Sequence, residues 1–124
     1  MLNEEVKERW GETHAYAEFS EKTKDYSKGR FADIHSGLEN IFRDFSELMQ
    51  SGLAPDSSEA QELVKKLQGY ITEHYYTCTD EILAGLGQMY VADERFKSNI
   101  DKYAAGTAEY VCKTIEMYTK RQAD

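Results

Sequence analysis

The sequence has little proline, little cysteine and no long apolar run. Pro55 is the one proline among 124 residues, so the chain is free to form helices over most of its length. Cys78 and Cys112 are too few for a disulfide framework, which favours a protein of the reducing cytoplasm. No apolar run approaches the roughly 20 residues of a membrane span, so we expect no membrane partner.

Positive charge is also scarce. Lysine and arginine number 15 against 23 aspartates and glutamates, a formal net charge of −8, and no basic stripe occurs. Such a chain repels a phosphate backbone. We therefore expect no contact between this chain itself and nucleic acid; any DNA binding requires another domain.

Motifs for metals, cofactors and catalysis are missing as well. His14, His35 and His74 fall in three different predicted elements, and no His-x-x-x-His or Cys-x-x-Cys spacing occurs. There is no Gly-x-Ser-x-Gly, P-loop or dinucleotide fingerprint. We expect no metal, no cofactor and no enzymatic activity.

The apolar residues that are present recur at helical spacing. Residues 31–50 carry apolar side chains three and four apart, which predicts an amphipathic helix ended by Gly52. After a turn at Pro55, residues 58–75 repeat the pattern and predict an antiparallel partner helix. The capping pair of this second helix is either Ser58 with Gln61 or Asp56 with Glu59.

Three further helices are predicted after Cys78. Thr79 caps the first and Asp93 the second, and a break at Gly106 precedes the last, in which Cys112 faces the core. The sequence thus predicts a single all-α domain of five or six helices. The expected core residues are Phe42, Phe45, Leu63, Leu67, Leu86, Phe96 and Ile115.

Two segments suggest that something approaches the chain closely. Gly85 and Gly87 weaken one short helix by about 1 kcal/mol each relative to alanine, so either a neighbouring helix or a ligand comes near its backbone. Residues 1–28 carry a thin, mostly aromatic stripe. This segment either docks permanently on residues 29–124 or closes over a bound molecule, and we expect it to be the least stable part of the free protein.

Cys78 stands at a predicted helix N-terminus. The free backbone N–H groups and the helix dipole favour its thiolate, whereas Asp80 and Glu81 oppose it. We expect a modest net effect on the thiol, and we expect Cys78 to be more accessible than Cys112. Packing and reactivity both remain open interpretations.

Residues 75–111 read YYTCTDEILAGLGQMYVADERFKSNIDKYAAGTAEYV. This run contains an aromatic pair, a cysteine, a helix with Gly-Leu, and then Met-Tyr-Val-x-Asp and Arg-Phe motifs. In these motifs and their order the chain resembles a known family, the TipAS antibiotic-recognition domain. Two upstream segments match as well: the turn GLAPDSSEAQELV and the entry motif of Trp10, Gly11, Thr13, Ala15 and Tyr16.

The resemblance implies a globin-like helical bundle without haem. Such domains usually form the C-terminal effector half of MerR-type transcription activators, behind a winged-helix DNA reader and a dimerising coiled coil. It implies hydrophobic antibiotics as partners, notably thiopeptides, and a homodimer through the parent coiled coil. In the thiopeptide-binding prototype a cysteine adds to a dehydroalanine of the drug, a Michael addition that needs a thiolate and no turnover.

We expect the ligand in a groove between the N-terminal segment and the helices on either side of Cys78. The wall residues are Tyr75, Tyr76, Met89 and Tyr90, with Trp10 and Tyr16 as a lid and Cys78 as the candidate for covalent attachment. Plain core packing is the competing interpretation for each, and for Met89 the favoured one. If the family's reactive cysteine lies further along the helix, this chain offers Gly85 or a neighbour, and only reversible binding remains.

Two classes of function follow. The first is a binding domain for hydrophobic, thiopeptide-like antibiotics, either as the effector domain of a drug-responsive regulator or as a stand-alone form that sequesters the drug. The alternative is a ligand-free structural or dimerisation module.

Overall fold

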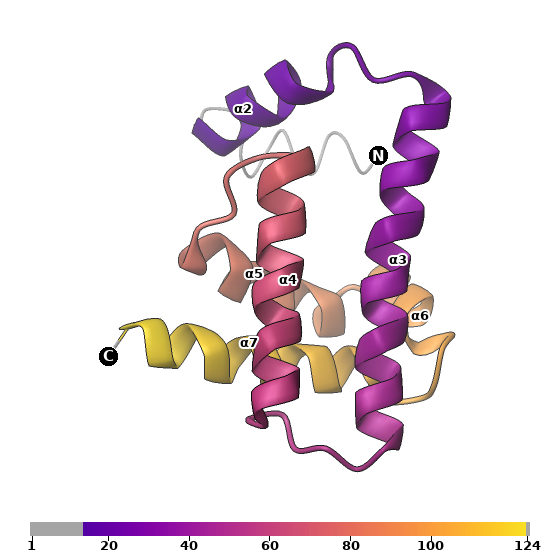
Figure 1. Cartoon of the computed structure of the whole chain (residues 1–124), viewed down its shortest axis with the longest axis vertical. Coiled ribbons are helices and arrows are strands. Elements are labelled where there is room, and N and C mark those ends of the chain that lie inside the picture. Colours follow the sequence, from indigo (N-terminus) through magenta and orange to yellow (C-terminus); the bar gives the residue numbers. More distant parts are fainter. Residues whose placement is uncertain (1–13, 124) are drawn as a thin grey trace.

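The computed structural model describes the backbone of residues 14–123 and the side chains of residues 17–121. This part of the chain forms six α-helices and no strand (Figure 1), which confirms the all-α prediction. Within it, no helix combines the length and the apolar character needed to cross a membrane. The helices are α2 (His14–Thr23), α3 (Lys28–Gln50), α4 (Ser58–His74), α5 (Asp80–Ala92), α6 (Glu94–Asp101) and α7 (Thr107–Ala123).

The expected hairpin of α3 and α4 is present, and the two helices run antiparallel (Figure 1). Helix α7 crosses behind both of them and contacts each. Helix α5 makes its most extensive contacts with α7, and α6 packs against both α5 and α7. Helix α7 is therefore the central element, which holds the hairpin on one side and the α5–α6 pair on the other.

Most helix ends are where the sequence predicts them. The Thr79 hydroxyl accepts a hydrogen bond from the Ile82 N–H at 3.2 Å, and the Asp93 carboxylate accepts one from the Arg95 N–H at 2.9 Å. Gly52 ends the hairpin's first helix with a φ of +80°, a left-handed conformation that glycine adopts without strain.

Both capping pairs predicted for α4 are wrong. The N-cap is Ser57, whose hydroxyl accepts a hydrogen bond from the Ala60 N–H at 3.2 Å, while Ser58 is already helical. Gln61 does not close a capping box; its side-chain N–H group donates to the Pro55 carbonyl oxygen at 2.9 Å and to that of Thr114 at 3.2 Å. Gln61 thus ties the turn to α7. Helix α3 likewise begins earlier than expected, with Ser27 as its N-cap.

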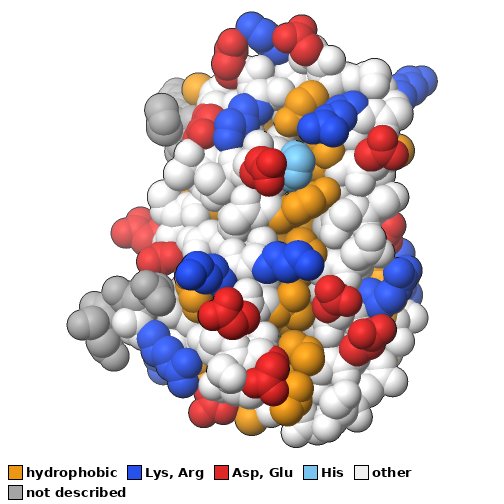
Figure 2. Space-filling view, viewed as in Figure 1, with side chains coloured by type: hydrophobic (Ala, Val, Ile, Leu, Met, Phe, Trp, Pro, Cys, Tyr) orange, Lys and Arg blue, Asp and Glu red, His pale blue; other side chains and the backbone are white. Residues whose placement is uncertain are grey.

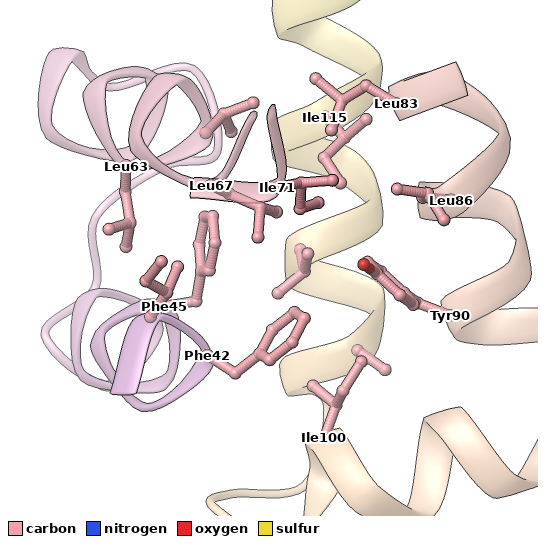
Figure 3. Packing of buried hydrophobic residues seen from close by; sticks show 14 of the residues in the cluster. Phe42, Phe45, Leu63, Leu67, Ile71, Leu83, Leu86, Tyr90, Ile100 and Ile115 are labelled. Atoms are coloured by element: carbon pink, nitrogen blue, oxygen red, sulfur yellow. The ribbon is translucent and has the colours of Figure 1, made fainter. Parts of the chain in front are cut away.

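The core forms where α3, α4, α5, α6 and α7 meet (Figure 3). Six of the seven predicted core residues are buried: Phe42, Phe45, Leu63, Leu67, Leu86 and Ile115. The prediction for Phe96 is wrong. Its side chain is only half-buried, because it packs against the outside of the core cluster, with its ring tilted by 46° to the Tyr90 ring at 6.1 Å between ring centroids.

Candidate ligand-binding site

Helix α2 lies across the end of α4 through aromatic contacts (Figure 1). The Phe19 ring stacks on the Tyr75 ring at 6.1 Å between centroids, and meets the Tyr76 ring edge to face at 6.5 Å. Phe19 and Tyr75 are half-buried, whereas Tyr76 is 6% exposed. These three residues, the aromatic seam, join α2 to the segment that leads to Cys78.

Polar contacts fix α2 to the same segment. The Glu18 carboxylate accepts hydrogen bonds from the Thr77 N–H at 2.8 Å and from the Thr77 hydroxyl at 2.7 Å. These bonds hold the pKa of Glu18 below its ordinary value. Lys22 donates from its Nζ to the Thr72 carbonyl oxygen at 2.5 Å, and the Tyr26 hydroxyl donates to the His74 carbonyl oxygen at 2.8 Å. The position of α2 therefore depends on residues 72–77.

Cys78 is buried, so the prediction that it is the more accessible cysteine is wrong. Cys78 is 4% exposed and Cys112 6%. The loop around Cys78 folds inward, because its N–H donates to the Thr72 hydroxyl at 3.0 Å and the Gln68 side chain donates to its carbonyl oxygen at 2.8 Å. These are contacts across the fold, and they override the boundary position that the sequence suggests.

Burial decides the protonation of this thiol. It raises the pKa of Cys78 to about 12, with the negative charge of Asp80 as a smaller cause, so the expected modest effect is also wrong. Burial raises the pKa of Cys112 to about 11, helped by Glu116. Neither cysteine forms a disulfide, and both carry a proton at neutral pH in the folded protein.

The structure brings Tyr76 and Tyr90 together with Cys78. Burial raises the pKa of both tyrosines, and the thiol lies close enough that its charge would raise each further. Tyr90 is 5% exposed and meets Phe42 edge to face at 5.4 Å, within the core cluster (Figure 3). This part of the predicted site is an interior wall, and only Tyr75 of the tyrosine pair is half open to solvent.

Half-buried Met89 borders a hollow of about 360 Å³ along α5. The hollow is lined by Gly85, Gln88, Met89, Val91, Ala92 and Asp93. Gly85 leaves backbone open there, since a Cβ at this position meets no atom within 4 Å. Gly87 has a different explanation: its missing Cβ makes room for Ile115 of α7, whose Cγ2 would lie 3.2 Å away. Gly87 therefore allows close packing of α5 on α7, and Gly85 leaves part of the α5 backbone accessible at the surface.

The two glycines are expected to respond oppositely to alanine. Gly85→Ala should raise the free energy of unfolding by about 1 kcal/mol, the ordinary gain in helix propensity. Gly87→Ala should lower it by about 1 kcal/mol, because Ile115 is fully buried and cannot move aside, so overpacking outweighs that gain. Urea unfolding of both variants measures this. A rise of similar size in both would contradict the assigned contact between α5 and α7.

Trp10 and the Tyr16 side chain, the predicted lid, lie outside the described residues. Phe19, Glu18 and Thr77 were not among the predicted site residues, although all three connect α2 to the Cys78 segment. Phe19 has a signal in the sequence, since it lies on the same aromatic stripe as Tyr16. Nothing in the sequence indicates the surface on which that stripe docks.

Comparison with known proteins covers almost the whole chain. The family profile of the TipAS antibiotic-recognition domain matches residues 2–118. The chain is 40% identical over 115 residues to the HTH-type transcriptional activator TipA of Streptomyces coelicolor and of Streptomyces lividans. It is 32% identical over 119 residues to the HTH-type transcriptional activator mta of Bacillus subtilis. These matches cover 93–96% of this chain and 45–46% of the relatives, so the chain spans a little under half of their length.

Solved structures of the same kind match the fold. A complex of nosiheptide with TipAS from Streptomyces lividans aligns with a TM-score of 0.86 and 36% identity, over 99% of this chain and 86% of that one. The antibiotic-binding domain of a TipA-class multidrug resistance transcriptional regulator aligns with a TM-score of 0.68 and 33% identity, over 73% of this chain and 97% of that one. The globin-like helical bundle implied by the resemblance is confirmed, and the chain belongs to the TipAS antibiotic-recognition domain family.

Proposed function

We propose that this chain binds a hydrophobic, thiopeptide-like antibiotic between α2, the end of α4 and α5, and that it does so without chemical turnover. Family membership supports the ligand class, since the relative from Streptomyces lividans is in complex with the thiopeptide nosiheptide. The observation that carries the location is the aromatic seam of Phe19, Tyr75 and Tyr76. The half-buried rings of Phe19 and Tyr75, where two elements meet, are suited to an apolar ligand that inserts between them.

Two surfaces serve the proposed site. The half-buried ring of Tyr75 offers an apolar face beside α2, and Gly85 and Met89 offer a hollow in which a ligand reaches the α5 backbone. The buried pair of Tyr76 and Tyr90 supports these surfaces from the inside. In the same proposal, Trp10 and Tyr16 complete the site as a lid.

We further propose that capture is reversible. A Michael addition needs a thiolate within reach of the ligand, and Cys78 is both buried and held as a thiol by its raised pKa. Position 85, one possible site of a reactive cysteine further along the helix, is glycine here. Affinity must then come from apolar burial and from the closing of the N-terminal segment.

The regulatory role extends beyond this chain. DNA binding and homodimerisation through a coiled coil would reside in parts of a longer protein like the relatives, with this domain as the drug sensor in the cytoplasm. A stand-alone form would instead lower the free drug concentration. Both roles need the same binding event, so one experiment on the domain tests their shared basis.

The test is thermal unfolding with and without nosiheptide, followed by intact mass after denaturation. We expect the melting temperature to rise with nosiheptide concentration, because a ligand specific to the folded state stabilises it. The mass of the denatured protein should equal that of the free chain. An unchanged melting temperature would favour the ligand-free structural module, and an adduct lost in Cys78→Ala but kept in Cys112→Ala would replace reversible by covalent capture.

A further inference from the structure

A second hollow, of about 460 Å³, lies between α3 and α4, far from the aromatic seam. It is lined by Asp44, Glu47, Leu48, Glu59, Glu62, Leu63 and Lys66. It occupies the half of the hairpin near the α3–α4 turn, whereas α2 lies at the opposite end (Figure 1). Leu63 and Tyr75 are twelve positions apart along the chain, about 18 Å of helix. The two places are therefore distinct.

The floor of this hollow is apolar. Leu63 is 9% exposed, and half-buried Leu48 packs against the same core. In the space-filling view a stripe of hydrophobic side chains runs between the two helices, with acidic side chains on both sides of its lower part (Figure 2). An apolar strip in a depression of this volume matches the usual range for small-molecule sites, about 300–1,000 Å³.

The rim is acidic. It has four carboxylates, those of Asp44, Glu47, Glu59 and Glu62, against the single ammonium of Lys66. Within residues 17–121, no ion pair joins any of these carboxylates to a lysine or arginine. Glu59 accepts a hydrogen bond from the Ser58 hydroxyl, which lowers its pKa and keeps it ionised. An excess of negative charge around an apolar floor attracts a positive, apolar molecule and repels a negative one.

We propose that this hollow is a second binding site, for a lipophilic cation: a compact apolar molecule with a delocalised or quaternary positive charge. The apolar body covers Leu48 and Leu63, and the charge lies among carboxylates contributed by both helices. Such a cation is weakly hydrated, so its transfer out of water costs little hydration free energy. The exposed carboxylates of the rim keep their own hydration when the cation binds. The domain then binds two chemically different drugs at two separate sites. This site does not depend on the antibiotic site at α2.

Two ions of nearly equal shape and opposite charge test the proposal: tetraphenylphosphonium and tetraphenylborate. Each is titrated into the full chain while backbone amide shifts are followed by NMR. We expect saturable shifts for residues 44–48 and 59–66 with the cation, and binding at least about tenfold weaker there with the anion. Equal affinity of the two ions at these residues would overturn the proposal, because binding would then be apolar only.

A pair of charge-matched double variants completes the test. Glu47→Gln with Glu62→Gln removes two rim charges, and Glu21→Gln with Asp25→Asn removes two exposed charges near α2, at the other end of the molecule. The rim variant should weaken tetraphenylphosphonium at least about tenfold, and the α2 variant less than about twofold. Equal weakening by both would mean general attraction to an acidic protein. Shifts confined to α2 and α5 would mean that the cation uses the antibiotic site, and either result contradicts a second site.

Discussion

Replacing Tyr90 by alanine is expected to lower the free energy of unfolding by about 3–5 kcal/mol. The ring is 5% exposed, meets Phe42 edge to face and contacts Phe96, so its deletion leaves a cavity that the rigid neighbours cannot fill. For a domain of this size such a loss is a large part of the total stability. Chemical denaturation of the purified variant measures it.

Tyr90→Phe is the matched control, because it keeps the ring and removes only the hydroxyl. We expect a change within about 1.5 kcal/mol. Antibiotic affinity, measured on both variants below their melting temperatures, then tests the proposal that Tyr90 supports the ligand site from the inside. A Tyr90→Ala protein with near-normal stability would contradict its place in the core. A folded Tyr90→Ala protein with unchanged affinity would leave Tyr90 as core packing alone, and a loss of affinity in Tyr90→Phe would assign the role to its hydroxyl.

Cys78 is expected to react with a thiol reagent at least about 10³-fold more slowly in the folded protein than an exposed thiol. With a pKa of about 12, the fraction of thiolate at about pH 8 is about one in 10⁴, against about one quarter for an ordinary thiol. Burial adds a steric barrier, since 4% of the residue is exposed. Stopped-flow reaction with dithiobis(nitrobenzoate) measures the rate.

The single variants Cys78→Ala and Cys112→Ala assign each phase of this reaction. In denaturant both thiols should react at the ordinary rate, which shows that the fold causes the protection. Fast reaction of native Cys112→Ala, in which Cys78 is the remaining thiol, would mean that Cys78 is reachable and ionised. That result would support covalent capture of the antibiotic at Cys78 in place of reversible binding.

The helices follow from local rules, and the failures occur where tertiary contacts decide. Thr79 and Asp93 are capping residues with no competitor nearby, so their positions could be predicted. The turn before α4 offers Asp56, Ser57 and Ser58 in succession, and the sequence gives no reason to choose among them. The choice of Ser57 leaves Gln61 free to bind α7, a contact between residues 53 positions apart.

The candidate site was predictable in its residue types and only partly in its geometry. The aromatic pair before Cys78 does lie at a junction of elements, as the pattern indicates. The inward fold of the loop depends on Thr72 and Gln68, whose hydrogen bonds to Cys78 have no signature in the sequence. For the same reason the sequence predicts the aromatic stripe to which Phe19 belongs, but it does not predict the contact between Phe19 and Tyr75.

Calorimetric titration of nosiheptide into Phe19→Ala and Tyr103→Ala tests the central claim most directly. Each variant deletes one half-buried ring, on α2 in the first case and after α6, away from the proposed site, in the second. The claim that the antibiotic binds at the aromatic seam predicts that Phe19→Ala weakens binding by at least about tenfold, about 1.4 kcal/mol. It predicts that Tyr103→Ala leaves the affinity within about twofold. Equal affinities for the two variants and the unaltered protein would place the antibiotic elsewhere and contradict the account.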